Sequence, residues 1–121
     1  MSEHRMQWYQ SELIDQIIEG SKTATVRPIA WSEGLDAFNT ALHCGATYTV
    51  YDRAETPRCR VRITGIELAR WDAIPELLWR RDPAVNGEVG LEAFRADHWD
   101  YFDQPDDAYE FLALYFDHID A

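Results

Sequence analysis

Residues 20–27 read Gly20-Ser21-Lys22-Thr23-Ala24-Thr25-Val26-Arg27. The apolar residues before this stretch recur at helical spacing, and Gly20 can take the left-handed conformation that ends a helix. The β-branched residues that follow favour a strand, which Pro28 stops. Lys22 is the only lysine of the chain. A lone amine, two hydroxyls and a guanidinium at such a junction can form a compact site that binds an anion or activates a nucleophile.

Hydrophobic periodicity predicts the other elements of the chain. Helices are predicted over 7–19, 71–79 and 91–102, and strands over 23–26, 46–52, 58–68 and 111–116. The segment 29–44 has no clear hydrophobic period and is predicted to be a long loop with a short helical turn over 35–42. The loop is either a lid or binding loop, or a connection without a function of its own. Strands 46–52 and 58–68 form a hairpin. Hairpin connections favour antiparallel pairing, so the element order predicts an α+β domain or a small barrel.

Composition indicates one globular domain over residues 1–121, because a chain with 46% hydrophobic residues can bury a continuous core. The first residues lack the apolar run of a secretory signal, and no stretch approaches the roughly 20 apolar residues that span a bilayer. We therefore expect a soluble cytoplasmic protein without membrane contact. Cys44 and Cys59 lack metal-ligand spacing and are expected to be buried, reduced thiols rather than a disulfide or a zinc site. His98 is expected to be a hydrogen-bonded core histidine, and no metal site or cofactor is predicted.

The charge distribution limits the possible partners. The net charge is −11, and after Arg95 the chain holds eight acids and no Lys or Arg, whereas the rest holds 14 acids against 11 bases. Because nucleic-acid binding depends on neutralising phosphates with Lys and Arg, we expect no binding to long duplex DNA. A short strand or a single nucleotide in a local basic cleft remains compatible with this distribution. Arginines 58, 60 and 62 alternate along one predicted strand and are either its solvated face or a weak nucleic-acid track.

Several spaced motifs together carry a resemblance to a known family. They are Gly20-x-Lys22-Thr23-x-Thr25-x-Arg27 after a helix, Gly45-x-x-Tyr48-x-Val50 at the start of a strand, and His98-x-x-Tyr101-Phe102 before the closing strand. Over nearly its whole length the chain resembles the ASCH domain family. The resemblance implies a PUA-like fold, a small mixed β-barrel flanked by helices, with a cleft lined by the Lys-Thr-Arg segment. It also implies RNA binding, and some members of the family deacetylate N4-acetylcytidine or are described as ribonucleases.

The resemblance further implies catalytic roles for particular residues. In the amidohydrolase branch a lysine, the threonine three positions on and a downstream glutamate act together, and the first two correspond to Lys22 and Thr25. Lys22, its pKa lowered by burial, would remove the proton of Thr25, whose oxygen would attack the acetyl carbonyl. The family's Glu-Gly dipeptide is Asn86-Gly87 here, and an amide cannot act as a general acid or base. Either Glu88 substitutes for that glutamate or the third group is missing.

Three functional hypotheses follow. The first is a binding module whose cleft holds a nucleotide, a modified nucleoside or short single-stranded RNA, with the candidate ligand-binding residues Lys22, Thr23, Thr25, Arg27, Trp31 and Asn86. Trp31, in the long loop, is the candidate for stacking on a base. The second is a hydrolase of the N4-acetylcytidine amidohydrolase or ribonuclease type, with the candidate catalytic residues Lys22, Thr25 and Glu88. The third is a protein-interaction module that uses the acidic C-terminal third. The sequence leaves the oligomeric state open.

Overall fold

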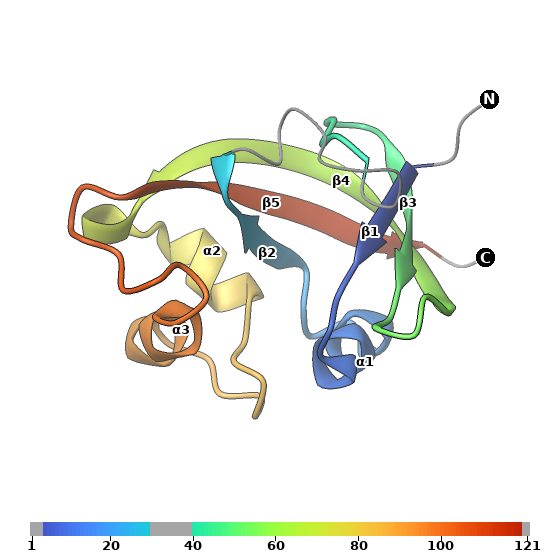
Figure 1. Cartoon of the computed structure of the whole chain (residues 1–121), viewed down its shortest axis with the longest axis horizontal. Coiled ribbons are helices and arrows are strands. Elements are labelled where there is room, and N and C mark those ends of the chain that lie inside the picture. Colours follow the sequence, from blue (N-terminus) through green and yellow to red (C-terminus); the bar gives the residue numbers. More distant parts are fainter. Residues whose placement is uncertain (1–3, 30–39, 120–121) are drawn as a thin grey trace.

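Residues 4–29 and 40–119 are described in the computed structural model (Figure 1). Five strands form one sheet in the order β1-β3-β4-β5-β2. Their bounds are His4–Gln7 for β1, Ala24–Arg27 for β2, Thr47–Tyr51 for β3, Pro57–Arg70 for β4 and Glu110–Ile119 for β5. The helices are α1 (Ser11–Glu19), α2 (Glu76–Arg81) and α3 (Leu91–His98), and a short 3-10 turn covers Trp71–Ala73. The α+β class is therefore confirmed.

The predicted barrel is wrong in one respect, because the sheet does not close. In the part of the chain that the structure describes, β1 and β2 are the two edges: β1 pairs only with β3, and β2 only with β5. The β1–β3 pair is parallel and the other three pairs are antiparallel, so the sheet is mixed. The strand β1 occupies part of the helix predicted over 7–19, which begins at Ser11 instead.

The closing strand β5 is buried on both faces over most of its length. Its side chains alternate between two hydrophobic clusters: Leu112, Leu114 and Phe116 pack in the cluster that includes Ile14 and Ile17 of α1. The alternate residues of β5, Phe111, Ala113 and Tyr115, pack in the second cluster, which also includes side chains of α2 and α3. A strand covered on both faces appears in the sequence as a continuous apolar run, which explains why the segment 111–116 shows no alternation.

Helix α1 ends at Gly20, as predicted, and the chain turns there toward β2. Gly20 has φ 93°, in the left-handed region, and its N–H donates to the carbonyls of Gln16 and Ile17. The N–H groups of Ser21 and Lys22 also donate to the Gln16 carbonyl. This tight turn leads into β2, which lies between α1 and the other two helices (Figure 1), and Lys22 lies two residues before that strand. Among the described residues, no helix has the length and apolarity to cross a bilayer.

The two cysteines have different surroundings, and their reactivities should differ. Cys44 is exposed, so the expectation of a buried thiol is wrong at that position. Cys59 is partly buried against the core, and burial raises its pKa from 9.0 to about 11. Thiolates are the nucleophiles, so at pH 8 the thiolate fraction of Cys59 should be about a hundred times smaller than that of a thiol with the ordinary pKa. In iodoacetamide labelling followed by peptide mass spectrometry, Cys44 should react first, and the Cys59 rate should rise steeply toward pH 11. Equal rates at pH 8 would contradict the packing described here.

Candidate functional site

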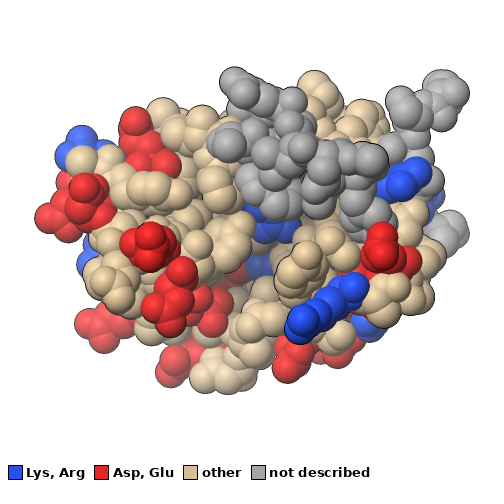
Figure 2. Space-filling view, in the orientation of Figure 1, with Lys and Arg blue, Asp and Glu red and all other residues tan. Residues whose placement is uncertain are grey.

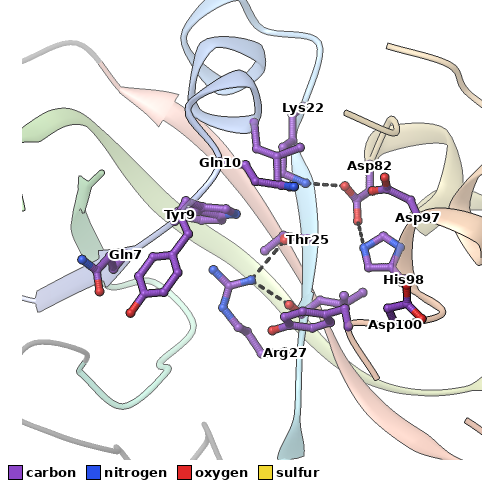
Figure 3. Close-up of a pocket in the computed structure, with 14 residues that line it drawn as sticks. Gln7, Tyr9, Gln10, Lys22, Thr25, Arg27, Asp82, Asp97, His98 and Asp100 are labelled. Carbon is purple, nitrogen blue, oxygen red and sulfur yellow. Dashed lines mark hydrogen bonds and ion pairs between the residues drawn. The ribbon is translucent and has the colours of Figure 1, made fainter. Parts of the chain in front are cut away.

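A pocket of about 680 Å³ lies between the start of α1, strand β2 and the end of α3 (Figure 3). Its lining combines charged, hydroxyl and aromatic side chains from four separate segments. They are Gln7, Trp8, Tyr9, Gln10, Leu13, Lys22, Thr25, Val26, Arg27, Asp82, Asp97, His98, Asp100 and Tyr101. Pockets of this size are typical of sites that hold a small ligand.

Lys22 places its ammonium group inside the protein. The residue precedes β2, and its side chain is only 2% exposed. Its Nζ donates a hydrogen bond of 2.9 Å to the Ala24 carbonyl and forms an ion pair with Asp82 (Figure 3). Removing an ammonium from water costs on the order of several kcal/mol, and a hydrogen-bonded counter-charge offsets that cost. Asp82 is therefore the residue that makes the buried position of Lys22 tolerable.

Asp82 is held in place by the segment before it. The residue follows α2 directly, and its side chain is 1% exposed. Arg81 donates to Thr23 Oγ1 at 2.8 Å, and the Thr23 N–H donates to the Arg81 carbonyl at 2.9 Å. These two bonds join the end of α2 to the residue after Lys22. The carboxylate of Asp82 consequently lies beside the lysine.

His98 lies on the other side of the same carboxylate. Its Nε2 is 3.5 Å from Asp82 Oδ2, and its Nδ1 is 2.8 Å from the Phe94 carbonyl (Figure 3). Because a carbonyl oxygen only accepts, Nδ1 carries a proton, and a second proton on Nε2 would create an ion pair with Asp82. His98 is 8% exposed and hydrogen-bonded within the fold, as expected, and it also lines the pocket. Lys22, Asp82 and His98 thus form a buried polar chain.

Burial lowers the pKa of Lys22 below its ordinary value of 10.5. The charge and hydrogen bond of Asp82 oppose this effect, and the nearby charge of Arg27 adds to it. A lowered pKa increases the fraction of neutral amine at neutral pH, and only that form can accept a proton. Lys22 can therefore act as a proton acceptor more readily than an exposed lysine.

Thr25 and Arg27 occupy alternate positions of β2 and project to the same side. Both are buried, at 3% and 5% exposure, and both line the pocket. Arg27 donates to Thr25 Oγ1 at 3.3 Å and to the Val26 carbonyl at 2.7 Å, and its guanidinium carbon lies 4.5 Å from the centre of the Trp8 ring. The ammonium of Lys22 donates to Ala24 and Asp82 rather than to Thr25. Lys22 and Thr25 share the pocket because Lys22 lies before the strand begins.

The sequence and the fold of the chain can be compared with those of known proteins. A family model described as the ASCH domain matches residues 4–113. The chain belongs to the ASCH domain family. None of the curated protein sequences gives a significant match.

Solved structures with low sequence identity share the fold of this ASCH domain. An ASCH domain from Lactobacillus crispatus JV V101 superposes with a TM-score of 0.77 at 14% identity, over 98% of this chain and 81% of that one. A protein from Enterococcus faecalis V583 gives 0.67 at 16% identity, over 99% and 82% of the two chains. A variant of an ASCH protein from Zymomonas mobilis gives 0.59 at 16% identity, over 99% and 76%. At these identities the likeness concerns the fold alone.

Not every predicted site residue of this ASCH domain reaches the pocket. Lys22, Thr25 and Arg27 line it, whereas the Thr23 hydroxyl accepts the hydrogen bond from Arg81 and lies outside the lining. Asn86 and Glu88 are exposed in the loop after Asp82, and the Glu88 N–H donates to Asn86 Oδ1 at 2.9 Å. Trp31 lies outside the described residues.

The carboxylate beside Lys22 therefore comes from Asp82, which the sequence pattern did not single out. Asp82 lies four positions before Asn86, where the resemblance places the family's glutamate. The available signal was indirect: a single buried lysine needs an acidic partner, and Asp82 is the acid closest before Asn86. In the part of the chain that the structure describes, no group of three or more His, Cys, Asp or Glu side chains could hold a metal ion.

Breaking the buried pair should destabilise the domain strongly. Lys22→Met leaves the Asp82 carboxylate buried without its partner, and the free energy of unfolding should fall by about 3–5 kcal/mol. The double variant Lys22→Met/Asp82→Leu removes both charges and should recover most of that loss, as measured by urea denaturation. As a control, Arg80→Met removes the cation of an exposed pair with Glu76, both side chains being over 60% exposed, and should cost less than about 1 kcal/mol. A Lys22→Met variant as stable as the Arg80→Met control would refute the buried pair.

Proposed function

We propose that this ASCH domain binds a single nucleoside unit in the pocket, as a free nucleoside, a nucleotide or one unit of short single-stranded RNA. The observation that carries the proposal is the convergence of Lys22, Thr25 and Arg27 on one pocket of about 680 Å³. RNA binding is what the family resemblance implies, and a volume of this size suits one nucleoside rather than a long strand.

The remaining lining supports a ligand that is flat and polar. Tyr9 and Tyr101 line the pocket and are 67% and 50% exposed, so their rings are available at its mouth. Base stacking on aromatic side chains contributes about 1–3 kcal/mol per base. Thr25 and Arg27 supply a hydroxyl and a guanidinium, which suit the hydrogen-bonding edge of a base.

A second candidate function is hydrolysis of an N-acyl group on such a nucleoside. The arrangement of Lys22, Thr25 and Asp82 favours it, because it supplies an amine of lowered pKa, a hydroxyl and a carboxylate in one pocket. In this reaction the neutral Lys22 amine takes the Thr25 proton, and Oγ1 attacks the acyl carbon. The C–N bond then breaks, and the proton passes to the leaving amine. Water hydrolyses the resulting ester, releasing the acid and restoring Thr25. Arg27, which donates to Oγ1, would stabilise its developing negative charge.

Calorimetry with cytidine, N4-acetylcytidine, cytidine 5′-monophosphate and a short RNA tests both candidates. Thr25→Val keeps the shape of the side chain and removes its hydroxyl, so nucleoside affinity should fall about three- to tenfold. Thr64→Val, on the exposed side of β4 and outside the pocket, is the matched control and should bind normally.

The reaction products separate the candidates. Acetate release from N4-acetylcytidine that disappears in Thr25→Val supports the hydrolase, and strand scission of the RNA supports the ribonuclease alternative. Binding without products supports the binding module alone. If none of the four compounds binds, or if Thr25→Val binds every one of them as the wild type does, the proposed function is wrong.

A further inference from the structure

We propose that Asp97 and Asp100 make the pocket selective for free nucleosides over ligands that carry a phosphate. The inference rests on the proposed function, because it narrows the class of ligand that the same pocket takes. It assigns a role to two residues outside the Lys22, Thr25 and Arg27 segment.

Asp97 and Asp100 lie where α3 ends, on the side of the pocket that also includes His98 (Figure 3). Asp97 is partly buried and Asp100 is exposed. The side chain of neither forms a hydrogen bond or an ion pair within the described part of the chain. The Asp97 charge reaches Lys22 only as the smallest of the influences on that amine. Both carboxylates therefore act on whatever enters the pocket.

The charges of the described lining do not favour an anion. Two cations, Lys22 and Arg27, face three carboxylates, those of Asp82, Asp97 and Asp100. The Lys22 charge is already engaged by Asp82. With that pair set aside, the remaining charged residues of the described lining are one cation, Arg27, and two carboxylates, Asp97 and Asp100, so their formal sum is negative.

The view in Figure 2 agrees with this balance. Lys or Arg atoms are visible in a hollow near the middle of this face, and Asp and Glu side chains gather over α3 to its left. A phosphate that approached from the α3 side would pass a negative surface. An uncharged sugar meets no such barrier, because its hydroxyl groups donate hydrogen bonds to carboxylates.

The acidic C-terminal third thus contributes to ligand selection in the proposed function. Two of its eight acids line the pocket. One unit charge at about 8 Å changes an affinity by roughly two- to thirtyfold at effective dielectric constants of about 80 to 20. Because the mouth is open to water, we expect an effect in the lower part of that range.

The test compares the four common ribonucleosides with their 5′-monophosphates by calorimetry on the whole chain. In the wild type, the nucleoside that binds best should bind at least about fivefold tighter than its monophosphate. Asp97→Asn/Asp100→Asn should raise the affinity for the monophosphate about three- to tenfold while that for the nucleoside stays level or falls. The control Asp103→Asn/Asp107→Asn changes the net charge equally at exposed positions outside the pocket, and should leave the preference unchanged.

Added salt gives an independent readout. It screens the repulsion between the phosphate and the two carboxylates, so it should reduce the wild-type preference for nucleosides over their monophosphates. Equal binding of nucleosides and monophosphates by the wild type would overturn this inference and leave the proposed function intact. The inference also fails, on its own, if the control variant changes the preference as much as Asp97→Asn/Asp100→Asn does. If nothing binds, the proposed function fails, and this inference fails with it.

Discussion

Burial of the Lys22 ammonium beside the Asp82 carboxylate joins two parts of the chain that are 60 residues apart. Neither group is stable alone in the interior, because each would lose its hydration without a compensating charge. The pair therefore requires that the exit of α1, the start of β2 and the end of α2 meet at one place. The Gln16 carbonyl, the left-handed Gly20 and the bonds between Arg81 and Thr23 provide that meeting point.

The chemistry of the pocket follows from this constraint. Because Asp82 forms an ion pair with Lys22, the lysine gives the pocket a buried hydrogen-bonding group whose charge is compensated. Arg27 then supplies the cationic character, with Trp8 packed under its guanidinium and Thr25 beside it. The α3 side contributes carboxylates and His98. One pocket thus combines a polar end that suits a base edge with an acidic side that suits hydroxyl groups.

The sequence predicted those parts of the structure that depend on local patterns. The end of α1 at Gly20, the strand after Lys22, the hairpin and the buried closing strand all appear as expected. Lys22, Thr25 and Arg27, which the resemblance placed together in one cleft, all line the pocket. Their functional roles stay proposals.

Features that depend on distant contacts could not be predicted. Strand β1 is only four residues long and is defined by parallel pairing with β3, far along the chain, so it was not predicted, and its last residue, Gln7, was assigned to the helix that follows. Asp82 reaches Lys22 through the contact between Arg81 and Thr23, which are 58 residues apart, and nothing in the local sequence marks it. Asn86 and Glu88, which the resemblance selected, lie in an exposed part of the same loop.

The state of the Lys22 amine is the property on which this account depends most directly. Because Lys22 is the only lysine, selective 13C labelling of lysine gives one side-chain signal in an NMR pH titration. We expect that signal to titrate below 10.5, to move to still lower pH in Asp82→Asn, and to shift when a nucleoside is added. A signal that titrates at the ordinary value, ignores Asp82→Asn and does not respond to ligand would show that the ammonium is in water, which would contradict the account.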